Sequence, residues 1–147
     1  MEVTLRTDAA PESIRRIAQK FPEVLLGAGT VITFEQAQVA WQAGAQFLVS
    51  PGLDERVLIW VKQKDLPFLP SAVTPTEIML GLNLGLNLLK FSPAEVLGDS
   101  KAINAISDPF PDVRFIPAGG VKAENLANIF GLKRSMQSAA HGWPNDK

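Results

Sequence analysis

Short apolar runs alternate along the chain with segments in which apolar residues recur at helical spacing. The runs predict strands at 3–5, 24–26, 47–49, 68–73, 88–91 and 113–116. The intervening segments predict helices at 8–20, 33–43, 54–64, from 74 onward, 100–106 and 122–130. Because strand and helix alternate throughout, the pattern is typical of βα units in a parallel sheet.

Six such units can be recognised in the 147 residues. A doubly wound sheet can be built from six units, whereas a (β/α)₈ barrel needs eight and usually about 250 residues. The pattern alone leaves both architectures open.

Two helix starts carry capping signals. Thr74-Pro75-Thr76-Glu77 combines an N-cap threonine, a first-turn proline and a glutamate at the third helical position. Thr33 and Gln36 have the spacing of a second capping box.

Composition narrows the function classes. Hydrophobic residues make up 46% of the chain and charged residues 20%, as in a globular protein, and the net charge is −1 with scattered basic residues. No basic stripe suggests nucleic acid. With no cysteine and a single histidine, His141, disulfides and thiolate or multi-histidine metal sites are excluded. No basic segment precedes an apolar stretch near Met1, and no apolar run is long enough to span a bilayer, so we expect a cytoplasmic protein without membrane contact.

Lys90 is the most informative single position, because it lies within the apolar run Leu88-Leu89-Lys90-Phe91. A buried lysine is costly unless its amine reaches a partner or a site. A partly desolvated amine is also a nucleophile toward carbonyl carbon, so the position suggests imine-forming chemistry. Taken alone, the position favours the simpler explanation, a lysine that extends to water or forms a structural ion pair.

Other polar residues and glycines stand where predicted strands end, and in parallel α/β folds sites form at the carboxyl ends of strands. Glu2 and Arg6 are an even number of residues apart, which predicts one face of one strand, as either a functional pair or a structural ion pair. Gly27-Ala28-Gly29-Thr30 is interpreted as a tight turn, and Gly119-Gly120 as a turn able to bind phosphate.

Taken together, these residues suit an α-keto acid substrate. They supply an amine nucleophile, a carboxylate for proton transfer, and an arginine and a threonine that can hold a substrate carboxylate.

Five motifs, in order and spacing, resemble 2-keto-3-deoxy-6-phosphogluconate aldolase, which often also acts on 4-hydroxy-2-oxoglutarate. The resemblance covers Met1 to about Phe130. The motifs are Glu2-Val3-Thr4-Leu5-Arg6-Thr7, Gly27-Ala28-Gly29-Thr30, Ser50-Pro51-Gly52-Leu53, Lys90-Phe91-Ser92-Pro93-Ala94-Glu95 and Pro117-Ala118-Gly119-Gly120-Val121.

The resemblance implies a class I aldolase of the (β/α)₈ TIM-barrel family, usually a homotrimer, that needs no metal or other cofactor. Lys90 would form the imine with the keto carbon, and Glu2 would move protons. Arg6 and Thr30 would hold the carboxylate of pyruvate. The remaining positions implied in substrate binding are Pro51, Pro70, Ser92, Ala118, Gly119 and Gly120.

The sequence also departs from the family. Many members have glycine at the position of Ser71, phenylalanine at Ser92, glycine at Asp99 and threonine at Ala118. The family pattern has a further strand and helix before Glu2 and an eighth strand with a Gly-Gly-Ser-Trp phosphate loop after Phe130. We therefore expect an incomplete barrel of about six βα units over 1–131, followed by an irregular tail over 132–147.

The tail suggests a frameshift. Codons for the segment from Met136 to Pro144, read from the third base of each codon, permit Ala-Val-Gly-Gly-Ser-Trp-Leu-Ala, which is the family's eighth strand and phosphate loop. The coding DNA tests this hypothesis directly.

Two other functions stay open on the sequence. The chain could be a non-catalytic, partly folded product of a broken aldolase gene. It could also be a small phosphate-binding α/β module that has the barrel pattern without the chemistry.

Overall fold

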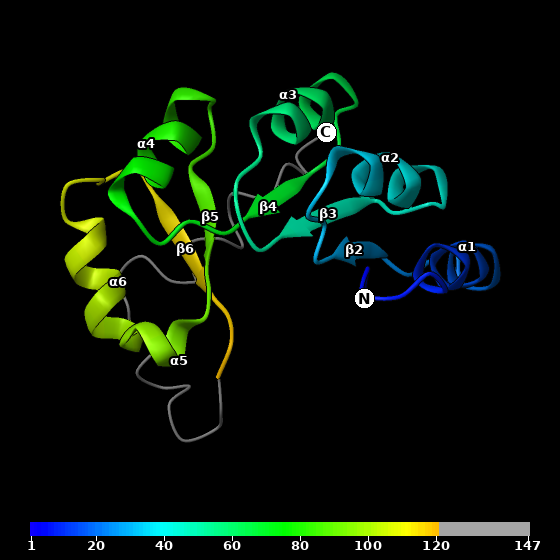
Figure 1. Cartoon of the computed structure of the whole chain (residues 1–147), viewed down its shortest axis with the longest axis horizontal. Coiled ribbons are helices and arrows are strands. Elements are labelled where there is room, and N and C mark those ends of the chain that lie inside the picture. The colour runs from blue at the N-terminus through cyan, green and yellow to red at the C-terminus, as the bar shows by residue number, and fades with distance from the viewer. Residues whose placement is uncertain (121–147) are drawn as a thin grey trace. The chain divides into compact units, whose positions relative to one another are not determined.

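The computed structural model describes residues 1–120, in which strands and helices alternate as the sequence predicts (Figure 1). The chain divides into two compact units, one from Met1 to Pro70 and one from Ser71 to the C-terminus. The helix predicted at 122–130, the boundary predicted at 131 and the tail predicted at 132–147 lie outside the described residues.

The first unit contains four strands and three helices. In chain order they are β1 (Glu2–Thr4), α1 (Ala10–Lys20), β2 (Gly27–Gly29), α2 (Phe34–Gln42), β3 (Phe47–Ser50), α3 (Glu55–Gln63) and β4 (Phe68–Pro70). The strands are parallel and lie side by side in the order of the chain, β1-β2-β3-β4. A doubly wound sheet reverses its strand order, so this uninterrupted order favours the barrel type of βα fold.

The second unit contains α4 (Pro75–Asn83), β5 (Leu88–Phe91), α5 (Ala94–Leu97), α6 (Asp99–Ser107) and β6 (Arg114–Pro117). β5 and β6 are parallel, with Lys90 opposite Ile116, and Ser71 forms an isolated bridge to Lys90. Leu89, Phe91 and Phe115 are buried against residues of α4 and α6 in one hydrophobic cluster. The strand at 88–91 was predicted to the residue, and the short helix α5 was not predicted.

The second strand is placed differently from the prediction. The apolar run 24–26 precedes the strand, and the supposed turn Gly27-Ala28-Gly29 is itself β2, fully buried. The cause is crowding from both neighbouring strands. A Cβ on Gly27 would overlap the Phe47 ring, and a Cβ on Gly29 would overlap the Glu2 carboxylate. Glycine is therefore required within this strand rather than in a turn beyond it.

The capping predictions are confirmed for one helix and corrected for the other. At α4, Thr74 and Glu77 form the reciprocal capping box. At α2, the Thr33 hydroxyl accepts from the Gln36 N–H, but the Gln36 side chain accepts from Ile32, one residue before the N-cap. Thr33 therefore caps the helix without the reciprocal bond that defines a capping box.

Candidate active site

Lys90 lies on the face of β5 that turns away from the hydrophobic cluster of its unit. Burial alternates along β5 and along β6, with the second and fourth residue of each strand buried and the others half-buried. Phe91 and Phe115 fill the buried side, with ring centroids 5.9 Å apart and planes at 84°. Lys90 and its partner Ile116 lie on the opposite side. The apolar run around Lys90 is thus explained by one buried face, and the lysine is not part of the core.

The backbone of Lys90 is held by hydrogen bonds, whereas its amine has no partner among residues 1–120. The Lys90 carbonyl accepts from the Ala72 N–H at 2.9 Å and from the Ser71 hydroxyl at 3.1 Å. Within residues 1–120 no hydrogen bond or ion pair involves Lys90 Nζ, and the residue is half-buried. A structural ion pair therefore does not account for this lysine in the part of the chain that is described.

The loop after β5 is joined to the loop after β6. The Ala118 N–H donates to Phe91 at 2.9 Å, the Ala94 N–H donates to Ala118 at 2.8 Å, and the Glu95 N–H donates to Gly119 at 3.2 Å. Gly119 and Gly120 both have positive φ, 85° and 78°. Only glycine adopts this backbone conformation at little cost, so the predicted turn is present at the carboxyl end of β6.

Atoms of the loop after β5 and of α5 leave little space beside the two glycines of this turn. A Cβ on Gly119 would lie 3.2 Å from Pro93 Cα and 3.6 Å from the Ser92 hydroxyl, and a Cβ on Gly120 would overlap Glu95. At the carboxyl ends of β5, which carries Lys90, and of β6, the second unit therefore brings together Ser92, Ala118, Gly119 and Gly120.

In the first unit, Glu2 lies over the glycine strand β2. Its carboxylate occupies the space that a side chain at Gly29 would fill, so the two residues share a face of the sheet. Glu2 is exposed, and in the described residues it forms no ion pair with Arg6 or with any other side chain. The structural ion pair considered for Glu2 and Arg6 is therefore absent from this part of the chain.

The prediction that Glu2 and Arg6 point to one face of a single strand is wrong. β1 ends at Thr4, and the Arg6 N–H donates back to the Thr4 carbonyl at 3.0 Å, so the chain turns before Arg6. The alternation of side chains along a strand does not extend across such a turn. Arg6 is exposed, on the loop between β1 and α1.

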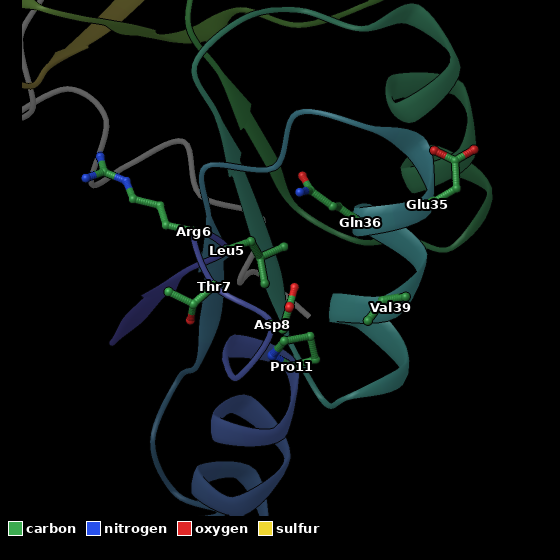
Figure 2. A pocket seen from close by; sticks show the side chains of 8 residues that line it. All are labelled: Leu5, Arg6, Thr7, Asp8, Pro11, Glu35, Gln36 and Val39. Atoms are coloured by element: carbon green, nitrogen blue, oxygen red, sulfur yellow. The ribbon is translucent and has the colours of Figure 1, made fainter.

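A cavity that sequence reasoning missed lies beside this loop. Its volume is about 380 Å³. It is lined by Leu5, Arg6, Thr7, Asp8, Pro11, Glu35, Gln36 and Val39 (Figure 2). Figure 2 shows the Arg6 guanidinium extending away from the other labelled side chains, so its charge is directed out of the cavity. Asp8 comes from a loop, and Glu35 and Gln36 come from helix α2. Because none of them directly follows a predicted strand, a search of strand ends does not find them.

Thr30 follows β2 in a left-handed backbone conformation, with φ of 58°. This conformation is rare for a β-branched residue and costs of order 1–3 kcal/mol, and such strain gathers at functional sites. The Val31 N–H donates to Val49 at 3.1 Å, so the backbone on either side of Thr30 stays tied to the sheet. The conformation supports a functional role for the half-buried Thr30.

The two predicted proline positions also lie at strand ends in the first unit. Ser50 pairs with Pro70 at the end of β3 and β4, where Pro70 is buried and Pro51, the next residue after β3, is exposed. In all, Glu2, Arg6, Thr30, Pro51 and Pro70 belong to the first unit, and the lysine and the glycine turn belong to the second.

Among residues 1–120, no three His, Cys, Asp or Glu side chains gather where they could hold a metal ion. None of the described helices combines the length and apolar character that a membrane span requires.

The comparisons of the sequence with known proteins point to one family. The family model described as KDPG and KHG aldolase matches residues 1–142. The KHG/KDPG aldolase of Escherichia coli K12 is 45% identical over 133 residues, which are 90% of this chain and 62% of that protein. The 2-dehydro-3-deoxy-phosphogluconate aldolase of Treponema pallidum is 48% identical, over 91% of this chain and 64% of that protein. The chain thus spans less than two thirds of the length of these relatives.

One similar solved structure contains a covalent intermediate with pyruvate. KDPG aldolase from Legionella pneumophila, captured with pyruvate as a covalent carbinolamine intermediate, matches with a TM-score of 0.85 and 39% identity. The match covers 91% of this chain and 65% of that one.

Proposed function

The chain belongs to the KDPG and KHG aldolase family, and from this premise we propose that it is a class I aldolase. Its substrates would be 2-keto-3-deoxy-6-phosphogluconate, 4-hydroxy-2-oxoglutarate or both, each cleaved to pyruvate and an aldehyde. One observation carries the proposal. The half-buried Lys90 amine has no partner in the described residues and lies on the open face of β5.

Lys90 would begin the reaction. Its Nζ attacks the keto carbon C2 to give a carbinolamine, which loses water to form a protonated imine. When the C4 hydroxyl gives up its proton, the C3–C4 bond breaks and its electron pair moves into the imine as an enamine. The aldehyde then leaves, C3 takes up a proton, and water releases pyruvate and the free amine.

Proton transfer and binding of the substrate carboxylate are assigned to three further residues. Glu2 would move protons to and from the C4 hydroxyl and C3 through water. The Arg6 guanidinium and the Thr30 hydroxyl would hold the substrate carboxylate. The further positions proposed to bind substrate are Pro51, Pro70, Ser92, Ala118, Gly119 and Gly120.

The finer architecture belongs to the same proposal. About six βα units within residues 1–131 would belong to a fold of the (β/α)₈ barrel type, and the codons for 132–147 would be out of frame. The uninterrupted strand order β1-β2-β3-β4 supports a barrel. Sequencing the coding DNA tests the frameshift, which fails if the alternate frame lacks the Gly-Gly-Ser-Trp run and its continuation.

Assembly and location follow from the family and the chemistry. We expect a homotrimer, as in the family, which sedimentation of the full chain would measure. Because phosphorylated acids do not cross membranes unaided, an enzyme that uses them would work in the cytoplasm, which cell fractionation would test.

Release of pyruvate from each substrate tests the proposed activity. Lys90→Met should lower kcat by on the order of a thousandfold or more, because the covalent step is lost. Lys101→Met, which removes an exposed lysine of α6 in the same unit, should leave the rate unchanged. A folded wild-type chain that releases no pyruvate would contradict the proposal and would favour a non-catalytic protein.

A further inference from the structure

We infer that Ser71 is a positioning residue for the reaction. Its buried hydroxyl, together with the Ala72 N–H, holds the Lys90 carbonyl and so determines where the lysine amine meets the keto carbon of the substrate. This role is exerted through Lys90, without contact between Ser71 and the substrate. The inference rests on the aldolase function proposed above and adds a residue to it, at a position where many family members have glycine.

The first argument is that strand pairing places Ser71 beside Lys90. The two residues are partners in a parallel bridge, and residues paired in this way direct their side chains to the same face of a sheet. The residues that follow them, Ala72 and Phe91, are both buried in the hydrophobic cluster on the other face. Ile116 is the partner of Lys90 on its second side. On the face of β5 that turns away from the cluster, Lys90 therefore lies between Ser71 and Ile116.

The hydrogen bonds of the Lys90 carbonyl are the second argument. This oxygen accepts from the Ala72 N–H at 2.9 Å and from the Ser71 hydroxyl at 3.1 Å, so both of its lone pairs are used. Residue pairs along the whole length of β5 join it to β6, whereas an isolated bridge joins it to the segment that begins at Ser71. On this side the position of the Lys90 backbone therefore depends on few bonds, and the serine hydroxyl supplies one of them.

Burial is the third argument. Ser71 is only 2% exposed, and a hydroxyl removed from water is costly unless it forms a hydrogen bond. In the described residues the Lys90 carbonyl is the acceptor that satisfies this hydroxyl. The bond fixes the backbone from which the lysine side chain extends. Because reaction requires Nζ to lie about 3–3.5 Å from the keto carbon, a small shift of that backbone should lower the rate.

A kinetic comparison of two buried serines tests the inference on the full chain. Ser71→Ala should lower kcat for pyruvate release about fivefold, the worth of one hydrogen bond, and leave KM unchanged, because other residues still bind the substrate. Ser107→Ala is the matched control, since Ser107 of α6 is also 2% exposed and its hydroxyl donates to the Asn104 carbonyl at 3.1 Å. The control should lose a similar amount of stability and keep its kcat.

Ser71→Gly provides a second variant without the hydroxyl. Many family members have glycine at this position, so the variant serves if Ser71→Ala does not fold, and its kcat should fall at least as far. Wild-type kcat in the Ser71 variants, or an equal loss in Ser107→Ala, would overturn the inference.

The rate of imine formation separates this inference from the proposed activity. After pyruvate is added, the fraction trapped by borohydride should rise about fivefold more slowly in Ser71→Ala than in the wild type or Ser107→Ala. In ¹³C-labelled protein, the Lys90 carbonyl signal should move in Ser71→Ala and stay in place in Ser107→Ala. If the signal moves but the imine forms at the wild-type rate, the positioning role fails and the aldolase proposal stands. If the wild type forms no imine, the aldolase proposal fails and the positioning role fails with it.

Discussion

The two units differ in how one face of their strands is kept free of large side chains. In the second unit, side chains alternate along β5 and β6, so large residues fill the core and Lys90 is left on the other face. In the first unit, β2 is Gly27-Ala28-Gly29, and the missing side chains make room for Phe47 and for the Glu2 carboxylate. In the second unit the alternation of side chains leaves space around Lys90, and in the first unit the glycines of β2 leave space for Glu2.

The difference explains why the Lys90 amine and the Glu2 carboxylate each have room next to their strands. The Lys90 amine is free of protein partners in the described residues because its strand directs it away from the core. Glu2 depends instead on a neighbour, since any side chain at Gly29 would occupy its position. Substitutions near Glu2 should therefore change activity by displacing its carboxylate. Substitutions of Lys90 should change activity by removing the reacting amine.

The largest expected effect in the first unit comes from the Glu2 carboxylate itself. Glu2→Gln keeps the size of the side chain and removes its capacity to accept a proton, so kcat for pyruvate release should fall between about a hundredfold and ten-thousandfold. Glu23→Gln, at an exposed position of the same unit, is the matched control. Equal rates for Glu2→Gln and the wild type would show that Glu2 only fills space over β2.

A methyl group at Gly29 should act on the same carboxylate indirectly. Gly29→Ala should displace Glu2, lower kcat about tenfold and destabilise the fold by about 1–3 kcal/mol through overpacking. Gly52→Ala is the comparison, because a Cβ there meets no atom within 4 Å. Denaturant unfolding and pyruvate release measure both effects, and equal behaviour of the two variants would refute the crowding at β2.

In the second unit, the capping box of α4 should contribute a smaller amount. Thr74→Ala removes the hydroxyl that accepts from the Glu77 N–H and should lower the free energy of unfolding by about 1 kcal/mol. Thr76→Ala, two residues later and exposed, should have almost no effect. Urea denaturation of both variants measures the difference, and a similar midpoint for the two would show that the box contributes nothing.

The smallest effect expected is a dependence of stability on acid. The Val57 N–H, and beyond it the Arg56 N–H and guanidinium, hold the pKa of Asp54 below its usual 3.8, although slight burial opposes this. For Glu77, partial burial raises the pKa, but hydrogen bonds from Val73 and Thr74 outweigh it and leave the pKa below 4.5. Because the folded pKa values are lowered, this stability is present above the unfolded values and is lost as pH falls through the folded ones.

Asp54→Asn isolates one of these groups, since asparagine caps a helix as well as aspartate does but carries no charge. At pH 7 the variant should be about 0.5 kcal/mol less stable than the wild type, and the gap should close as the pH falls below about 3.8. Urea denaturation at a series of pH values measures the gap. A gap that stayed constant with pH would show that the Asp54 charge does not contribute.

Alternation was the part of the fold that the sequence could predict. Leu88-Leu89-Lys90-Phe91 was identified as a strand to the residue, and Thr74 and Glu77 as a capping box, because both patterns are local. Gly27-Ala28-Gly29 was mistaken for a turn because the reason for its glycines lies in Phe47 and Glu2 on neighbouring strands. Nothing within three consecutive residues carries that information.

The candidate site shows the same limit. The Gly119-Gly120 turn was identified from its place at a strand end and Ser92 from the family resemblance, whereas Arg6 was assigned to a strand that ends two residues earlier. The chain turns there because the Arg6 N–H bonds back to Thr4, and residue spacing alone does not reveal that bond. The cavity lined by Asp8, Glu35 and Gln36 combines a loop with a helix, so it emerges only from the folded chain.

Trapping with pyruvate and borohydride tests the central claim, that the open face of β5 carries the reactive amine. Reduction of the imine fixes pyruvate irreversibly to the lysine that formed it, and peptide mass spectrometry then identifies that lysine. We predict a single adduct on Lys90, present in Lys101→Met and lost in Lys90→Met. Folded wild-type protein with no adduct, or with its adduct on another lysine, would contradict the account.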